Sequence, residues 1–275
     1  MDRRKAAGLL PYEAAVEALG SVGTMARYDD EIDLDAVVGS VARSEDFDAG
    51  FRPRRRRSER WRAVRERFRA GSFPPPIDVV QLGEVYFVVD GHHRVAAARE
   101  LGWTTLPARV RRVCTVAFAR RCLSLADLPA KASERRFLER FPLPDSVRNG
   151  VELDRPADWA RIADAATAWA YQQLRAGVEY CCAHDLASAW WRSEVVPRAA
   201  RVRSEGQWAD LGDLAVYVAA LAERDGLGLL DWADDPVVHA GVCGCTPDPG
   251  MQAGTSQVVD DDVRSGSDEP GPGVQ

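Results

Sequence analysis

The feature that most constrains the fold of this chain is a short apolar run that gives way to a helical pattern at one glycine. Residues 85–90 read Val-Tyr-Phe-Val-Val-Asp, which is β-branched and aromatic on both alternating faces, as in a buried strand. After Gly91, apolar residues recur at helical spacing through 95–101, and Gly102 can close the helix. The sequence therefore predicts a strand, a glycine turn and a helix in direct succession.

That junction is also the strongest candidate for a binding site. The first amides of a helix have no partner within the helix and carry a partial positive charge, so anions bind there. Asp90 would lie at the carboxyl end of the strand, and His92, His93 and Arg94 would surround the start of the helix. A purely structural role for these residues is the alternative to binding. A glycine suits many turns, and Asp90 or His92 can cap a helix.

Residues 77–113 resemble the core of the ParB/sulfiredoxin superfamily. The turn at 90–94, Asp-Gly-His-His-Arg, is similar to the Asp-Gly-His-Thr-Arg turn of the related free serine kinases, with His93 in place of the threonine. Partition ParB proteins have Gly-Glu-Arg-Arg there, and sulfiredoxins have Gly-Cys-His-Arg. His92 stands where the sulfiredoxin cysteine would be, so the resemblance argues against sulfinic-acid reductase chemistry.

The resemblance extends upstream to residues 32–48, which contain Val-Gly-Ser-Val and Asp-Phe-Asp. Uncharacterised ParB-like proteins carry these motifs before an amphipathic helix, a Pro-Pro-Ile strand and an Asp-Gly-His-His-Arg turn. The resemblance implies an α/β fold of the ParB/sulfiredoxin type, a mixed sheet with helices, followed by an all-helical C-terminal region. It also implies a nucleotide whose phosphates are bound by Gly91, His92, His93 and Arg94.

Nucleotide hydrolysis or phosphoryl transfer at this turn would need charge neutralisation and a base. We expect Asp90 to hold a divalent metal or to accept a hydroxyl proton, with His93 as a further catalytic group. The related kinases use an acidic residue in a comparable upstream segment, for which the candidates are Glu45, Asp46 and Asp48. The expected cofactor is a nucleotide (ATP, ADP or CTP) with Mg²⁺. A nucleotide-sensing regulator that binds without catalysis fits the same residues.

An arginine-rich segment interrupts an otherwise acidic chain. The net charge is −6, yet residues 52–69 hold ten arginines against two glutamates. Within this segment, Trp61, Val64 and Phe68 share one face, so residues 58–70 are expected to form an amphipathic helix. The run that precedes the helix is the candidate for contact with phosphates or nucleic acid: Arg54, Arg55, Arg56 and Arg57.

DNA binding, as in partition or transcription-regulating ParB proteins, is the alternative function. Those proteins carry a helix-turn-helix after the nucleotide domain. Here residues 124–128 faintly resemble its first helix, but Pro129 interrupts the pattern and no glycine turn separates two short helices. The arginine run is the support for DNA binding.

The chain divides into four expected regions. They are an N-terminal helix within 1–28 that ends at Gly20, a ParB/sulfiredoxin-like nucleotide-binding domain at 29–118, a helical domain at 119–240 and a disordered tail at 241–275. Strands are expected at 34–41, 77–82, 85–90 and 106–113, with a helix at 92–101. The strand after that crossover helix should have a parallel partner. Later helices are expected at 125–141, 156–176, 185–204 and 210–223.

Composition indicates a cytoplasmic protein without a membrane span. No apolar run approaches the roughly 20 residues that cross a bilayer, and the N-terminus lacks the pattern of a signal peptide. The six cysteines are therefore interpreted as reduced thiols. Two weak candidate metal sets, without Cys-x-x-Cys spacing, are Cys181, Cys182 and His184, and His239, Cys243 and Cys245. The sequence carries no signal for an oligomeric state.

Overall fold

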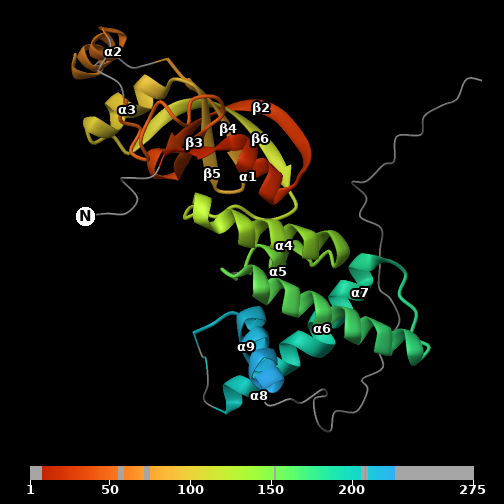
Figure 1. Cartoon of the computed structure of the whole chain (residues 1–275). Helices are drawn as coiled ribbons and strands as arrows, with labels where there is room; N and C mark the ends of the chain where they lie inside the picture. Colours follow the sequence, from red (N-terminus) through yellow and green to blue (C-terminus); the bar gives the residue numbers. More distant parts are fainter. Residues whose placement is uncertain are drawn as a thin grey trace, which may run out of the picture. The chain divides into compact units, whose positions relative to one another are not determined.

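The computed structural model of this protein describes residues 8–54, 59–70, 75–151, 153–205, 208 and 210–226. Among these residues the strands form one six-stranded mixed sheet in the order β1-β3-β5-β4-β6-β2 (Figure 1). In that order, the strands are Leu10–Pro11, Val37–Ser40, Val85–Asp90, Ile77–Leu82, Thr105–Thr115 and Ser21–Asp33. The mixed sheet confirms the expected fold class.

Strand direction decides which loops meet at each sheet edge. β3 is parallel to β5, β5 is antiparallel to β4, and β4 is parallel to β6. The strand after α3 (His92–Glu100) therefore has a parallel partner, but that partner is β4. β5 lies beyond β4 and runs antiparallel to β6, so the expectation that α3 is a crossover between parallel strands was wrong. Since β3 and β5 run in the same direction, their carboxyl ends meet at one edge.

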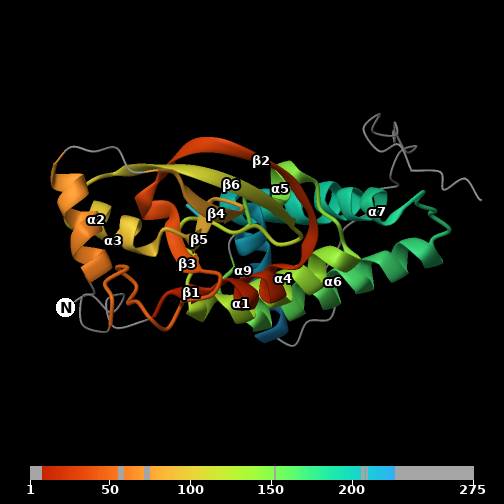
Figure 2. The same cartoon turned by 90° about the horizontal axis from the view of Figure 1, so that it is seen from above.

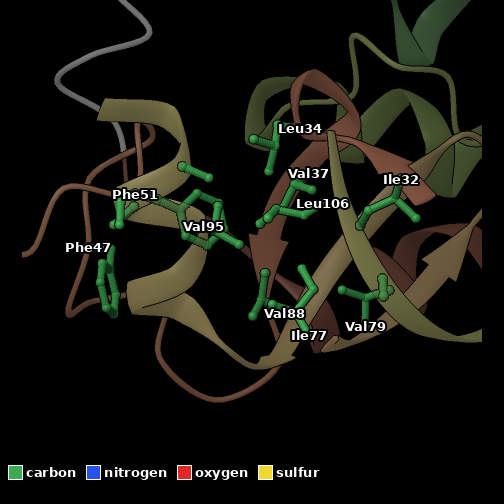
Figure 3. Close-up of a cluster of buried hydrophobic side chains, with 14 of the residues drawn as sticks. Ile32, Leu34, Val37, Phe47, Phe51, Ile77, Val79, Val88, Val95 and Leu106 are labelled. Atoms are coloured by element: carbon green, nitrogen blue, oxygen red, sulfur yellow. The ribbon is translucent and has the colours of Figure 1, made fainter. Parts of the chain in front are cut away.

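Helices cover both faces of the sheet. On one face, α2 (Glu59–Arg69) and α3 (His92–Glu100) lie side by side (Figures 1 and 2). Val79 of β4 and Val88 of β5 are directed to this face and pack with Val95 of α3 (Figure 3). The alternation of buried side chains along each strand thus supplies the core beneath α3.

The opposite face is covered by α1 (Tyr12–Leu19) and the start of α4 (Leu128–Arg140). Val80 and Phe87, which follow the two-residue period of the strands, pack there with residues of α1 and with Leu128. Pro129, which was expected to interrupt a helix, lies in the first turn of α4. Backbone N–H groups in a first turn have no hydrogen-bond partner within the helix, so proline, which lacks this group, is tolerated there.

Beyond β6 the described chain is helical, as expected. After a 3₁₀ turn at Leu125–Asp127, which precedes α4, the helices are α5 (Asp145–Arg148), α6 (Pro156–Arg175), α7 (Ala183–Trp190), α8 (Val196–Ser204) and α9 (Asp213–Gly226). Trp159, Trp190 and Tyr217 are fully buried in their shared core. A π-helical turn at Trp191–Val195 interrupts the single helix expected at 185–204. The turn lies next to Pro197, which has no N–H to donate to the backbone hydrogen bonds of a helix.

The expectation for residues 1–28 was wrong in part. α1 ends at Gly20 as predicted, with a left-handed φ of 72° at that glycine. However, β2 follows at once and runs through residue 28, so the expected boundary lies inside a strand. Most of β2 is exposed on both sides, which removes the alternating pattern that identifies a strand. Its pairing with β6 holds it in the sheet.

Several expectations fall outside the described residues: the tail at 241–275, His239, Cys243, Cys245, and Arg55, Arg56 and Arg57. Cys181 and Cys182 are exposed, and the Cys182 sulfur accepts the Asp185 amide at the start of α7. In the described part of the chain, no three His, Cys, Asp or Glu side chains are grouped to hold a metal. None of the helices described is long and apolar enough to cross a membrane.

Candidate functional site

The turn from β5 into α3 depends on Gly91. This residue caps the helix with a φ of 103°, a conformation that side-chain-bearing residues rarely adopt. A Cβ at this position would lie 2.4 Å from Cγ2 of Ile77 and 3.1 Å from Nε of Arg94. Backbone conformation and packing therefore both require glycine, and they place the first amides of α3 at the edge where β3 and β5 end.

The upstream segment predicted to contribute acidic residues lies beside this turn. Ser40 pairs with Val88 across β3 and β5, so the residues that follow Ser40 continue next to residues 90–94. The Phe47 ring stacks on the His92 imidazole at 5.3 Å between centroids and meets the His93 ring edge-on at 5.6 Å. Phe47 and Phe51 both lie beside α3 (Figure 3).

His92 is buried and bonded to β3. Its side chain is 3% exposed, and its Nε2 lies 2.7 Å from the Ser40 hydroxyl, which also accepts the Arg43 amide at 2.9 Å. Burial, followed by the positive charge of Arg43, lowers the pKa of the His92 imidazole from 6.5 to about 4. At neutral pH, His92 is therefore an uncharged group within the core and not a cation at the surface.

Arg94 contacts its own chain. Its Nη1 donates to the carbonyls of Pro75 and Pro76 at 2.7 and 2.6 Å, and its Nη2 donates to Oδ2 of Asp90 at 2.7 Å. The guanidinium thus holds the segment before β4 against the start of α3. Asp90 thus faces this cation while its side chain remains 66% exposed, and its role as a metal ligand stays a prediction.

The three upstream acids have different surroundings. Asp46 accepts from Nε of Arg43 at 2.9 Å, and Glu45 is exposed. Oδ1 of Asp48 accepts the amides of Gly50 and Arg52 at 2.9 and 2.8 Å. Asp48 therefore stabilises a turn, as Asp often does, whereas Asp46 lies close enough to the site for its charge to act on His92.

The arginine run begins on the same segment. The Arg54 amide donates to the Asp46 carbonyl at 2.9 Å, and Arg54 Nε donates to the Phe47 carbonyl at 3.1 Å. Beyond the undescribed residues of the run, α2 is amphipathic as predicted, with Trp61 and Phe68 buried. Arg54 therefore supports the backbone that carries Phe47.

Sequence reasoning assigned no role to two residues of this site, Ser40, which is the serine of the Val-Gly-Ser-Val motif, and Arg43. Ser40 is 1% exposed and contacts His92 directly. The Arg43 guanidinium lies over the Phe47 ring at 5.3 Å, and its side chain is 46% exposed beside the turn. The pairing of β3 with β5 brings these residues to the turn, about 50 positions later, so no local pattern predicts their contact with it.

Residues 51–124 match the family model of the ParB N-terminal domain, a segment that contains β4, β5, α3 and β6. Comparison of the sequence with curated proteins gives no match.

Two solved structures are similar to parts of the chain. The crystal structure of sulfiredoxin from Arabidopsis thaliana shares 21% identity, covering 32% of this chain and 88% of that one, with a TM-score of 0.24. A Pnob8-like ParB-N domain shares 12% identity over 70% of this chain and 87% of its own, also with a TM-score of 0.24.

Proposed function

Residues 51–124 of this chain match the ParB N-terminal domain, and from that premise we propose that the α/β region binds a nucleotide by its phosphates at residues 90–94. The observation that carries the proposal is the left-handed Gly91 at the start of α3, within the segment that matches the ParB N-terminal domain. A helix start offers amide donors and partial positive charge to an anion. The proposed ligand is ATP, ADP or CTP, with Mg²⁺ entering bound to the phosphates.

In this proposal the cation of the site is Arg43 and not Arg94. Arg94 uses both of its terminal nitrogens on the carbonyls of 75–76 and on Asp90. Arg43 contacts Asp46 through Nε, remains half-exposed, and lies close enough to the turn for its charge to act on His92. A guanidinium in that position suits a phosphate, because its planar donors match phosphate oxygens.

Turnover would require a base in addition to binding. Asp46 and Asp90 both lie close enough to His92 for their charges to act on its pKa, and each is paired with an arginine. Displacement of Arg43 towards a phosphate would release Asp46 from its ion pair. Measurement of inorganic phosphate released from a bound triphosphate separates hydrolysis from the regulator-like alternative of binding alone.

The direct test is a panel of ATP, ADP, CTP and GTP with Mg²⁺ against the full chain. A ligand at about 100 times its Kd stabilises the folded state by about 2.7 kcal/mol, which a thermal melt detects. Arg43→Gln should weaken binding at least about tenfold, because a charge-assisted hydrogen bond to phosphate is lost. Arg121→Gln is the matched control, since Arg121 is also exposed and bonded to one carboxylate, that of Asp33.

Two results would contradict this proposal. The first is the absence of any nucleotide-dependent rise in melting temperature at millimolar ligand. The second is equal affinity in Arg43→Gln and Arg121→Gln. DNA binding stays an alternative supported by the arginine run, of which the structure describes Arg54 alone. In the described residues that follow the sheet, a 3₁₀ turn leads into the single helix α4, without a glycine turn between two short helices.

A further inference from the structure

Two sets of contacts hold α3 against β3 and the 3₁₀ turn before it (Leu34–Ala36), one near each end of the helix. At the carboxyl end of α3, Arg99 Nη2 donates to the carbonyls of Leu34 and Val37 at 2.6 and 2.7 Å. At the amino end, His92 contacts Ser40 at 2.7 Å. The first contact involves backbone carbonyls, but the second joins two buried side chains and includes a residue of the proposed phosphate turn. A change in the Ser40–His92 contact should therefore alter phosphate binding at the turn.

The hydrogen-bonding capacity of Ser40 allows its hydroxyl to donate in that contact. A serine hydroxyl has one proton to donate and two lone pairs that accept. The Arg43 amide donates to Oγ at 2.9 Å, so one lone pair is used, and the hydroxyl proton and the second lone pair both remain for Nε2 of His92. Acceptance at Nε2 requires a neutral imidazole, whose remaining proton is then on Nδ1.

The surroundings of His92 favour the same neutral form. The ring is stacked against Phe47 and lies near Phe51, and it is almost fully excluded from water. Four charged or titratable side chains act on it: Arg43 and Asp46 from the segment after β3, Asp90 from β5, and His93 from α3. Burial is the largest influence and opposes protonation, because an imidazolium loses its hydration inside the core.

We propose that Ser40 is a positioning residue of the phosphate turn: its hydroxyl donates to neutral His92 and thereby holds the first turn of α3 against the end of β3. This inference rests on the proposed function and assigns His92 a role different from that of a phosphate-binding cation. His92 is the first residue of α3, so the contact fixes the direction of the amides beside it. Ser40 would touch no substrate.

Ser40→Ala tests the contact, and the chain offers a matched control. Ser133 is likewise a buried serine whose hydroxyl accepts from an N–H donor, Arg136, and donates to a carbonyl, that of Pro129. Loss of one hydrogen bond corresponds to about a fivefold change in an equilibrium constant. We expect Ser40→Ala to weaken binding of the best Mg²⁺–nucleotide about fivefold, and Ser133→Ala to leave the affinity within twofold of the original.

A pH profile separates positioning from charge. In His92→Gln, the amide oxygen reaches the place of Nε2, accepts the Ser40 hydroxyl and never carries a charge. The affinity ratio of the original chain to His92→Gln should be constant between pH 8 and pH 5.5, and protonation of the nucleotide cancels in that ratio. If His92 bound phosphate as a cation, the ratio would rise as the pH falls through about 6.5.

Histidine NMR gives a readout that needs no nucleotide. In the original chain, His92 should remain neutral down to about pH 5, and Ser40→Ala should move its titration upwards by about one pH unit, because the bond to the neutral form is lost. Ser133→Ala should not move it. If the original chain binds no nucleotide but Ser40→Ala shifts the His92 titration in this way, the proposed function is refuted and the hydrogen bond between Ser40 and His92 is confirmed.

The converse result would overturn the inference alone. If the original chain binds nucleotide, while Ser40→Ala and Ser133→Ala match it in affinity and in the His92 titration, Ser40 has no positioning role. If Ser40→Ala does not fold, two measurements still test the proposal. They are the pH dependence of the affinity ratio of the original chain to His92→Gln, and the His92 titration in the original chain. A ratio that rises on acidification then contradicts the proposal.

Discussion

Buried polar side chains serve different purposes in the α/β region and in the helical region. At the sheet edge, Ser40 and His92 are bonded to each other beside a helix start that leads to the surface. Between the sheet and the helices, buried Glu134 accepts from Lys131 at 2.7 Å and from the Phe118 amide at 3.2 Å. The second arrangement fastens α4 to the chain that enters it. Of these two buried polar contacts, the one between Ser40 and His92 adjoins a helix start at the surface, and it alone is interpreted as part of a binding site.

The two regions also differ in what their cores contain. The core beneath α3 is built from aliphatic side chains of strands, such as Val79 and Val88, with aromatic rings at its edge. The helical core is centred on large aromatic rings, among them Trp159, Trp190 and Phe137. Removal of one ring should therefore affect overall stability most, and changes at the turn should affect stability less and binding more.

The largest expected effect is that of Trp159→Ala. Trp159 is 1% exposed, packs against Phe137, and donates its indole N–H to the Leu153 carbonyl at 3.3 Å. Its truncation leaves a cavity, so the free energy of unfolding should fall by about 3–5 kcal/mol in chemical denaturation. Nucleotide affinity of the folded variant should be unchanged. A loss below about 1 kcal/mol would show that the helical core is not closely packed around this ring.

The next effect compares two glycines. Gly91→Ala introduces a Cβ in a left-handed conformation and against Ile77, whereas Gly102→Ala, at a φ of 75°, has no heavy atom within 4 Å of its new Cβ. We expect a loss of about 1 kcal/mol at Gly102 and about 3 kcal/mol at Gly91 in the same denaturation assay. Equal losses would mean that Ile77 moves aside without cost. Bulky residues at Gly91 would thus disrupt folding before they occupied any phosphate position.

The smallest effect concerns the pH dependence of stability. The pKa of His92 is lowered to about 4 in the folded state, so the unfolded chain binds the proton more tightly. The contribution of His92 is therefore complete above pH 6.5 and is lost as the pH falls from 6.5 towards 4, by at most about 3 kcal/mol. Urea denaturation at pH 7 and pH 5 should show a smaller acid-induced loss in His92→Gln. Identical losses would contradict a buried neutral imidazole.

Local patterns were sufficient for much of the fold. The strands at Ile77–Leu82 and Val85–Asp90 have the boundaries that their apolar runs predict, and α3 begins one residue after Gly91 as expected. These elements are buried on both faces or end at a glycine, so hydrophobicity and backbone preference agree within a few residues. β2 lacks such agreement, because its edge position leaves its side chains in water.

The sequence by itself determined the turn at 90–94, its glycine and the helix that follows, because these depend on neighbours along the chain. Only the tertiary structure decided what the side chains of the turn do. Arg94 binds the carbonyls of Pro75 and Pro76, and His92 meets Ser40, 52 positions earlier. Those contacts exist because parallel pairing of β3 with β5 brings two distant chain segments to one edge, and no short-range pattern records such a pairing.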